Sequence, residues 1–564
     1  MRRRLPDIAP LVLLFLLPLI LFWPQTVGGR TLLPTENLYQ YEPFASYREV
    51  VKAPAVPHNA LLSDLVLENY QWKTFIRESL AQGEIPLWNP YQFSGIPFLA
   101  AGQQSALYPF SLIYYVMPLT AAYGWFTVVQ LGLAGAFLYG FLRGGLGVGR
   151  FGATLGGVVY QLSGFFVISA VFPMIIAAAA WLPLLLWMIE YTLRQRPFLG
   201  RPASVPWVVI GAVALGCNIL AGHVEITYYT LLIMGYYAAA RLLILWRELR
   251  ARPAMPLQIV GMRAGWLLGM VVLGLALGAV QFIPLFELAS QNFRSGSASY
   301  AQVVGWAHPL RDVLQFALPN FYGNPAHHQY FDVFSREVVP VTVNAFGQPI
   351  DTIDWGIKNY AEGALYLGIL PLALAAYAVL SALIPRPRVG AASLPSVGAW
   401  PTPSAVPQGE QENRQNSEIP LHEGEGRYAG VRAFIFALLA LISVTFMFGL
   451  PTYRLLYLLP GIDQLHSPFR WIYGLTLSVA VLAGLGADRL FRSTAEETRG
   501  ALRLRRGFAL GLLALGALTL LGLLASYVFY DRVEPLIQGI LDHWVTNTGE
   551  PAATRFADAR MFFS

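Results

Sequence analysis

The stretch AAYGWFTVVQLGLAGAFLYGFL, residues 121–142, is an apolar run without a charged side chain. A helix of this length rises about 1.5 Å per residue and crosses the roughly 30 Å hydrocarbon core of a bilayer. Similar runs recur along the 564 residues, which are 55% hydrophobic and 12% charged. Because a soluble domain carries about 25% charged residues, the composition predicts an all-α polytopic membrane protein.

The apolar runs predict about eleven transmembrane helices. They lie at residues 8–24, 121–142, 151–172, 174–192, 205–222, 228–246, 264–285, 363–384, 433–450, 471–488 and 507–530. Arginines are concentrated in alternate connections, whereas the short turns near 173 and 223–227 carry none. Since cytoplasmic loops are enriched in Lys and Arg, we expect a multi-pass protein of the plasma (inner) membrane with a cytoplasmic N-terminus.

The first residues, Met-Arg-Arg-Arg followed by an apolar run, resemble a signal peptide. No clear cleavage site precedes Val27-Gly28-Gly29, so we expect the run to be kept as the first span. Either interpretation places the following loop outside.

The predicted topology divides the chain into four parts. Residues 1–384 form a membrane block of eight spans, with two large outer loops at 25–120 and 286–362 that contain short helices. Residues 385–432, rich in Pro, Gly, Ser, Gln and Glu, are predicted to be a disordered cytoplasmic linker. Three more spans follow in 433–530, and 531–564 is expected to be an outer-side tail.

The basic charge and the cysteine content exclude two classes of function. The formal net charge of +6 comes from arginines near the span ends, without a basic stripe or a nucleic-acid motif, so we expect no nucleic-acid partner. Cys217 is the only cysteine and lies in an apolar run. It therefore excludes an intrachain disulfide and a cysteine metal cluster, and is expected to be a small buried hydrophobic residue.

The first outer loop contains the strongest candidate for chemistry. Residues 60–82 suit an amphipathic helix that ends at Gly83 and has Asn59 or Ser63 as a cap. Asp64 would sit in its first turn and Glu68 one turn later on the same side. Two like charges at this spacing repel slightly, so the pair is tolerated if it is solvated, or useful if it meets a metal, a phosphate-bearing partner or a hydroxyl. The structural alternative is a helix-start residue followed by a solvated acid.

A series of motifs resembles the YfhO-type family of bacterial membrane proteins. The series begins with Asp64…Gln71-Trp72…Gly83-Glu-Ile-Pro86-Leu-Trp88-Asn89-Pro90-Tyr91…Gly95-Ile-Pro97-Phe98…Gln103…Tyr108-Pro109. It continues with Leu-Ser163-Gly164-Phe, Ala-Gly222-His223, Leu318-Pro319-Asn320-Phe-Tyr-Gly323, Glu362-Gly363-Ala-Leu-Tyr366-Leu-Gly368 and Ser467-Pro-Phe-Arg470, followed by Leu-Ala-Gly484-Leu-Gly486-Ala-Asp488.

The family is assigned to the GT-C class of polytopic glycosyltransferases. The resemblance implies a polyprenyl-phosphate sugar donor, an envelope glycan, lipid or teichoic-acid-like acceptor, and chemistry on the outer face. It makes Asp64 the general base, with Glu68 assisting, and leaves room for a divalent cation. Two departures bear on acceptor recognition: Val224-Glu225 replaces the Pro-Gln that often follows Gly222-His223, and the chain ends at Ser564 where the family often continues.

Six further residues are candidates for contacts with the substrate or its phosphate. They are His223 and Glu225 in a short outer turn, His308 and Arg311 three residues apart in the second loop, Glu362 before a span, and Arg470 at the start of another. Each has a structural alternative. A buried histidine is usually a hydrogen-bonded structural residue, Glu362 suits a helix cap, and Arg470 suits snorkelling to the interface.

The sequence is also compatible with two other functions. A transporter or flippase of lipid-linked glycans would show ionisable residues deep within spans or broken helices in matched halves. A non-catalytic scaffold for envelope assembly would keep the fold without the chemistry. The position of the candidate residues at the outer ends of the spans favours the enzyme.

Overall fold

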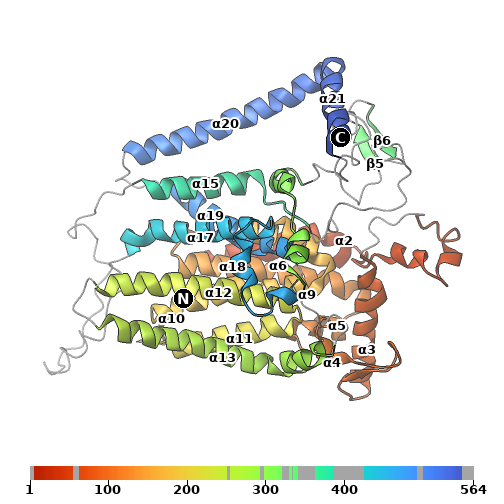
Figure 1. The fold of residues 1–564 in the computed structure, drawn as a ribbon, viewed down its shortest axis with the longest axis horizontal. Helices are drawn as coiled ribbons and strands as arrows, with labels where there is room; N and C mark the ends of the chain where they lie inside the picture. The colour runs from red at the N-terminus through yellow and green to blue at the C-terminus, as the bar shows by residue number, and fades with distance from the viewer. Residues whose placement is uncertain are drawn as a thin grey trace.

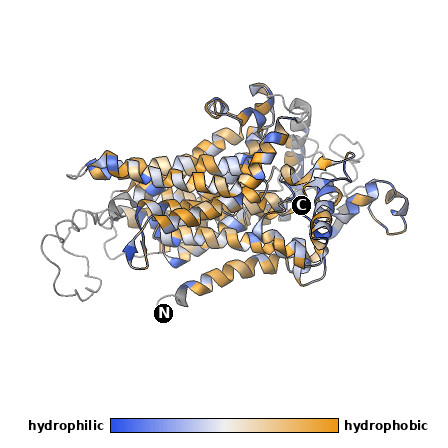
Figure 2. Cartoon of the chain, turned by 90° about the horizontal axis from the view of Figure 1, so that it is seen from below, coloured by the Kyte–Doolittle hydropathy of each residue, from blue (hydrophilic) through white to orange (hydrophobic). Residues whose placement is uncertain are grey.

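The computed structural model shows a helical bundle with its apolar helices side by side (Figure 1). It describes residues 5–54, 62–250, 255–291, 298–319, 329–332, 335–340, 363–384, 425–465, 467–491 and 499–548. Figure 2 shows hydrophobic residues along the whole length of these helices.

Seven of the described helices are long and apolar enough to cross a membrane, or eight if one bent pair is a single span. The seven are Leu119–Gly145 (α6 and its continuation η6), Pro173–Leu193 (α9 and α10), Val224–Arg250 (α12), Pro256–Ala289 (α13), Gly430–Met447 (within α17, Glu425–Met447), Pro468–Phe491 (η11 and α19) and Arg499–Val528 (α20). The prediction of an all-α, multi-pass membrane protein is confirmed to this extent.

The remaining predicted spans coincide with a bent pair and with shorter apolar helices. The pair is α7 (Arg150–Gln161) with Gly164–Val171, bent by 41°, where α8 (Gly164–Ile168) leads into a 3-10 turn, η7. The shorter helices are Asp7–Leu21 (within α1), Val205–Leu220 (α11) and Ile369–Leu383 (α15).

The centre of the bundle is α19 (Ile472–Phe491), whose span is 94% buried. Its close neighbour is α7, where glycines let the two backbones approach. A Cβ on Gly152 would lie 2.5 Å from the Gly484 carbonyl oxygen, so both positions require small residues. In contrast, the α20 span is 0% buried and stands apart from the bundle (Figure 1).

The first outer loop folds into short elements over one end of the bundle. A single π-helical turn, η4 (Leu65–Asn69), leads into α3 (Tyr70–Ala81), which stops before Gly83 at φ +76°. The predicted helix is therefore present, with its C-terminal glycine as expected. Its first turn, η4, has the wider π-helical geometry. The side chain of Ser63, one of the two predicted caps, accepts a hydrogen bond from the side chain of Asn37. Asn59 lies outside the described residues.

Lys73 fastens α3 to the rest of this loop. Its side chain is 1% exposed, donates to the carbonyl oxygen of Gln104 and lies 4.5 Å from the ring centroid of Tyr114. Burial lowers the pKa of Lys73 to about 7. The loop continues through β1 (Trp88–Asn89), which pairs antiparallel with β2 (Ile96–Pro97), and then α4 (Phe98–Ala101).

Residues 106–118 connect α4 to α6. They form η5 (Pro109–Ser111) and α5 (Leu112–Val116), too short to span. However, Tyr108 and Tyr114 are buried in the core, and Tyr108 donates to Gln130 and accepts from Trp181. The buried hydrogen-bond partners hold these aromatic rings inside the protein.

The predicted second outer loop is described at 286–291, 298–319, 329–332 and 335–340. It contains α14 (Tyr300–Gly305), capped by Ser299 and Gln302, and η8 (Leu310–Phe316). The antiparallel pair β5 (Gln329–Asp332) and β6 (Glu337–Pro340) follows. In the connection between α10 and α11, β3 (Pro197–Phe198) pairs with β4 (Arg201–Pro202). The short helices α18 (Tyr453–Tyr457) and η10 (Ile462–Gln464) precede η11. The last described helix, α21 (Tyr530–Thr548), follows α20.

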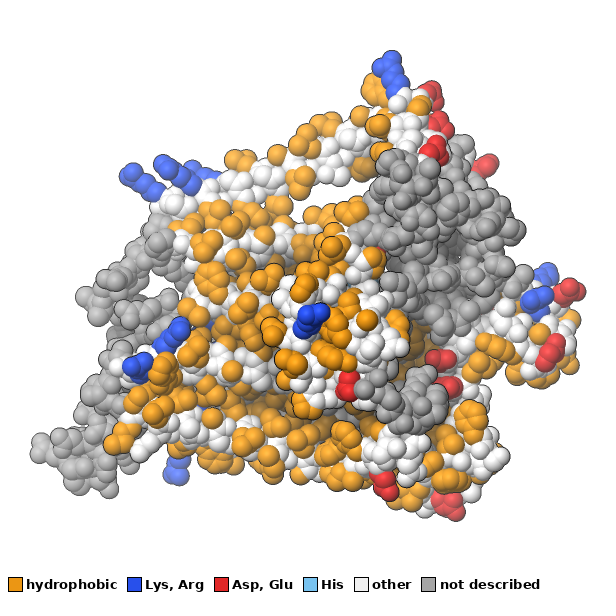
Figure 3. All heavy atoms as spheres, viewed as in Figure 1, with side chains coloured by type: hydrophobic (Ala, Val, Ile, Leu, Met, Phe, Trp, Pro, Cys, Tyr) orange, Lys and Arg blue, Asp and Glu red, His pale blue; other side chains and the backbone are white. Residues whose placement is uncertain are grey.

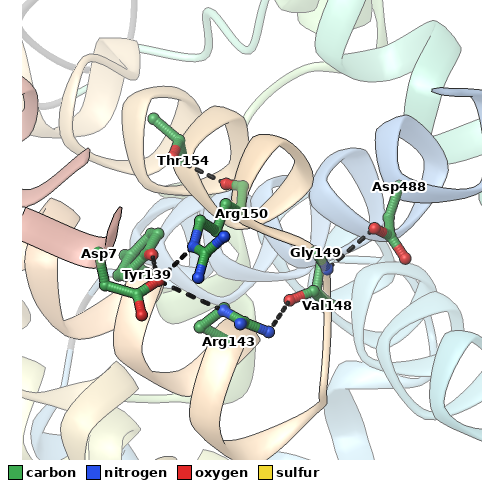
Figure 4. A network of polar contacts seen from close by, with 8 residues as sticks. All are labelled: Asp7, Tyr139, Arg143, Val148, Gly149, Arg150, Thr154 and Asp488. Carbon is green, nitrogen blue, oxygen red and sulfur yellow. Dashed lines mark hydrogen bonds and ion pairs between the residues drawn. The ribbon is translucent and has the colours of Figure 1, made fainter. Parts of the chain in front are cut away.

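The opposite end of the bundle, predicted to be cytoplasmic, is held by a polar network (Figure 4). Asp7 accepts from Tyr139 at 2.7 Å and Arg150 at 3.0 Å, and pairs with Arg143 at 3.5 Å. Asp488 accepts from the Gly149 backbone at 2.8 Å. Figure 3 shows Lys and Arg side chains at the end where α20 begins.

Candidate functional site

The turn between α11 and α12 joins the first outer loop to the bundle. Gly222 has φ +86°, and a Cβ there would lie 2.1 Å from the Gly102 carbonyl oxygen. Ser105 donates to the Ala221 carbonyl at 2.7 Å. Only glycine combines this backbone conformation with so close an approach. The turn thereby places His223 directly beside the loop segment that contains Gln103.

A second contact brings two other motifs together. Ser163 caps α8 by accepting from the Phe166 backbone, and the Gly164 N–H donates to the Tyr366 carbonyl at 3.0 Å. A Cβ on Gly164 would lie 2.9 Å from that oxygen. The segment 363–366 is therefore held against the start of α8.

Arg470 is the centre of the candidate site. Its Nε lies 3.3 Å from Glu225 Oε2, and its Nη1 contacts His223 Nε2. The Tyr229 hydroxyl lies 3.1 Å from Glu225 Oε1 and 3.2 Å from the Ser467 carbonyl oxygen. The Arg470 and Glu225 side chains are 14% and 12% exposed. Arg470 therefore turns inward to a polar cluster.

An apolar pocket adjoins this guanidinium. Its walls come from α8, η7, the start of α9 (Pro173–Ala179) and the start of α19. The lining residues are Phe165, Ser169, Phe172, Ile175, Ala364, Arg470 and Ile472. The pocket combines a mostly apolar wall with one cation, and its volume of about 10 Å³ has room for about one water-sized group.

His223 holds one side of Arg470. Its Nδ1 lies 3.2 Å from the Ile226 backbone nitrogen, and its Nε2 contacts Arg470 Nη1. A neutral imidazole has one acceptor nitrogen, so it accepts a hydrogen bond from only one of these two donors at a time. Burial, with the neighbouring positive charge of Arg470, keeps the pKa of His223 well below its usual 6.5. The ring is therefore neutral at pH 7, and it limits the positions open to the guanidinium.

The depressed pKa of His223 predicts a pH-dependent stability. Below pH 6.5 the unfolded chain takes up a proton that the folded chain does not, so stability should fall as the pH falls from 6.5. We expect the thermal-unfolding midpoint of His223→Gln to depend less on pH between pH 7 and pH 5 than the midpoint of the wild type does. His422→Gln, in the predicted linker, is the control. A wild-type midpoint that is constant over this range would contradict the assignment.

Asp64 and Glu68 lie on the outer side of the first loop, away from the core. Partial burial, together with the negative charge of Asp64, raises the pKa of Glu68 above its usual value. The two carboxylates are therefore electrostatic neighbours, as the i, i+4 spacing predicts. None of the described contacts joins this pair to Arg470.

His308 contacts an acid that was not among the candidate residues. It precedes η8, and its Nδ1 lies 3.2 Å from Asp312 Oδ2. Its Nε2 is buried without a hydrogen-bond partner in the described part of the chain, and its ring centroid lies 6.2 Å from that of Phe469. For Arg311 only the backbone, within η8, is described. Glu362 lies outside the described residues.

Sequence reasoning missed Tyr229 and Asp312. Tyr229 is one helical turn after Glu225 on α12, so the i, i+4 spacing was a usable signal. Asp312 stands at the same spacing from His308. The pocket walls Phe165 and Phe172 had no such signal, because aromatic residues near a membrane surface are common.

The carboxylates and histidines do not gather into a metal site. Among the described residues, no three His, Cys, Asp or Glu side chains are close enough to hold an ion. Cys217 is a free, buried thiol, as expected.

No protein-family model, curated protein or solved structure matches this chain. The likeness to YfhO-type proteins therefore remains a prediction that rests on the quoted motifs. The function has to be argued from the geometry of the Arg470 cluster and its pocket.

Proposed function

We propose that this chain is a GT-C-like membrane glycosyltransferase with about eleven spans. It would move a sugar from a polyprenyl-phosphate donor to an envelope glycan, lipid or teichoic-acid-like acceptor on the outer face. The observation that carries the proposal is Arg470, which lies beside an apolar pocket and is held in place by His223 and Glu225.

The pocket matches the two chemical parts of the donor. The phosphate that leaves with the lipid carries negative charge, and a preorganised guanidinium stabilises that charge as it develops. Phe165, Phe172 and Ile175 supply a surface for the isoprenoid next to the phosphate. Glu225 and His223 fix the orientation of Arg470 before the donor arrives, so that no reorganisation is needed during the reaction.

The acceptor would be activated from the first outer loop. In this proposal Asp64 takes the proton from an acceptor hydroxyl while that oxygen bonds to the anomeric carbon. The bond between the anomeric carbon and the phosphate oxygen breaks, and polyprenyl phosphate leaves with the electron pair. Asp64 is exposed, so an acceptor hydroxyl can reach its carboxylate. Glu68 is its neighbour one turn later, with a pKa raised by burial and by the charge of Asp64.

One observation favours a transporter or flippase as a second candidate. The pocket is lined by α8 and η7, the short half of the bent pair, and broken helices are typical of transporter binding sites. Against this, the buried acid Glu190 lies near the end of α10 (Leu182–Leu193) and is already paired with arginines. Transport would move the labelled lipid across a vesicle without breaking its sugar–phosphate bond.

Asp64→Asn tests the chemical step. We expect sugar transfer from a labelled polyprenyl-phosphate sugar to fall by about 100–10,000-fold, as for loss of a general base. The thermal midpoint should be unchanged because Asp64 is exposed. Glu78→Gln, an exposed acid on α3, is the matched control. Equal transfer by wild type and Asp64→Asn would exclude Asp64 as the base. Absence of transfer by wild type with several donors and acceptors would favour the transporter or a scaffold.

A further inference from the structure

Arg263 is a buried cation without a counter-charge, at the end of the bundle opposite the Arg470 pocket. It lies near the start of α13 and is 8% exposed. Its Nη1 donates to Ser204 Oγ at 3.3 Å, and its Nε is buried without a hydrogen-bond partner. Among the described residues no carboxylate forms an ion pair with it.

The surroundings add positive charge rather than neutralise it. Arg196 and Arg201 are exposed in the β3–β4 connection that leads to Ser204, and neither 194–204 nor 255–263 contains an acid. Arg194 differs, because its guanidinium lies 2.9 Å from the Glu190 carboxylate. The junction of α10, α11 and α13 therefore carries an uncompensated positive charge.

A buried charge without a partner is costly, since desolvation is not repaid by an opposite charge. An anion at this junction would supply that charge. Ser204 stands directly before α11, and Arg263 lies about two turns into α13, so the pair sits at the same end of both helices, where lipid phosphates would lie. Trp207 marks the same level, and its Nε1 donates to the Arg196 carbonyl at 2.8 Å.

Exposed apolar side chains lie on the same two helices as Arg263 and Ser204. Leu257 and Met262 flank Arg263 on α13 and are 75% and 51% exposed. Val205 and Val209, which follow Ser204 on α11, are exposed as well. A soluble phosphate would leave these surfaces uncovered, whereas the chains of a phospholipid would cover them.

We propose that the phosphate of an anionic phospholipid binds at Arg263, between the end of α10 and the starts of α11 and α13. Ser204 orients the guanidinium, and Arg196 and Arg201 add long-range attraction for the headgroup. This site is independent of the proposed glycosyltransferase activity, because it lies at the other end of the bundle and uses none of its residues.

The test is native mass spectrometry and thermal unfolding of the full chain in detergent, with phosphatidylglycerol, phosphatidylcholine or inorganic phosphate added. We expect wild type to retain phosphatidylglycerol and to gain several degrees in its unfolding midpoint. Arg263→Gln should lose both effects, and Ser204→Ala should weaken them. Arg503→Gln, at the same end of the isolated helix α20, should behave as wild type.

The paired variant Arg196→Gln/Arg201→Gln keeps the test decisive if Arg263→Gln does not fold. Both side chains are exposed, so the fold should persist while retention of phosphatidylglycerol falls several-fold. Equal retention by wild type and by each folded variant would overturn the proposal. Equal stabilisation by inorganic phosphate would also overturn it, by showing a site for a soluble anion.

Discussion

Replacing Arg470 with glutamine is expected to reduce sugar transfer by about 100–1,000-fold, the range for loss of one preorganised donor to a developing negative charge. Glutamine keeps some hydrogen bonding but removes the charge that faces the leaving phosphate. Arg470→Lys should recover only part of the rate, because lysine lacks the fork that holds Glu225 and His223 together. Initial rates at several donor concentrations measure the effect.

Two controls separate catalysis from folding in this experiment. Arg470→Gln alone leaves the Glu225 carboxylate, which is 12% exposed, without its guanidinium. The double variant Arg470→Gln/Glu225→Gln removes both charges and should fold better while remaining as inactive as the single variant. Arg454→Gln, an exposed arginine on α18, should transfer at the wild-type rate. Near-normal transfer by the double variant would show that Arg470 has no role in the reaction.

Glu190→Gln is expected to cause the largest loss of stability, about 3–5 kcal/mol, as when one partner of a buried ion pair is removed. The Glu190 carboxylate is 0% exposed and accepts from Tyr237 at 2.7 Å, from Arg194 at 2.9 Å and from Arg241 through both oxygens. A neutral amide would leave these arginines without their shared anion.

The free energy of unfolding in mixed micelles measures this loss. Glu287→Gln, an exposed acid near the end of α13, is the matched control and should change stability by less than about 0.5 kcal/mol. A loss of similar size in both variants would show that Glu190 does not hold α10 to α12.

The spans were predictable because the hydrophobic effect acts on each segment separately. The run at 121–142 lies inside the helix Leu119–Gly145, and every other predicted span also coincides with an apolar helix. The end of α3 was predictable for a similarly local reason, since Gly83 adopts the positive φ that a helix stop requires. Such features depend on residues close together in the sequence.

The site could not be predicted in the same way, because it depends on contacts between distant segments. His223 and Arg470 stand 247 residues apart, and either alone has an adequate structural explanation. The same holds for Tyr108, whose burial depends on Gln130 and Trp181 in other helices. Even the local contact of His308 with Asp312, four residues later, was not predicted.

Photocrosslinking with a polyprenyl phosphate that carries a diazirine in its first isoprene unit tests the central claim most directly. We expect crosslinks in wild-type protein at Phe165, Phe172 and Ile175, reduced by an excess of unlabelled polyprenyl phosphate and strongly reduced in Arg470→Gln/Glu225→Gln. Crosslinks that map elsewhere in the bundle, or that persist undiminished in the double variant, would contradict the assignment of this pocket to the lipid phosphate.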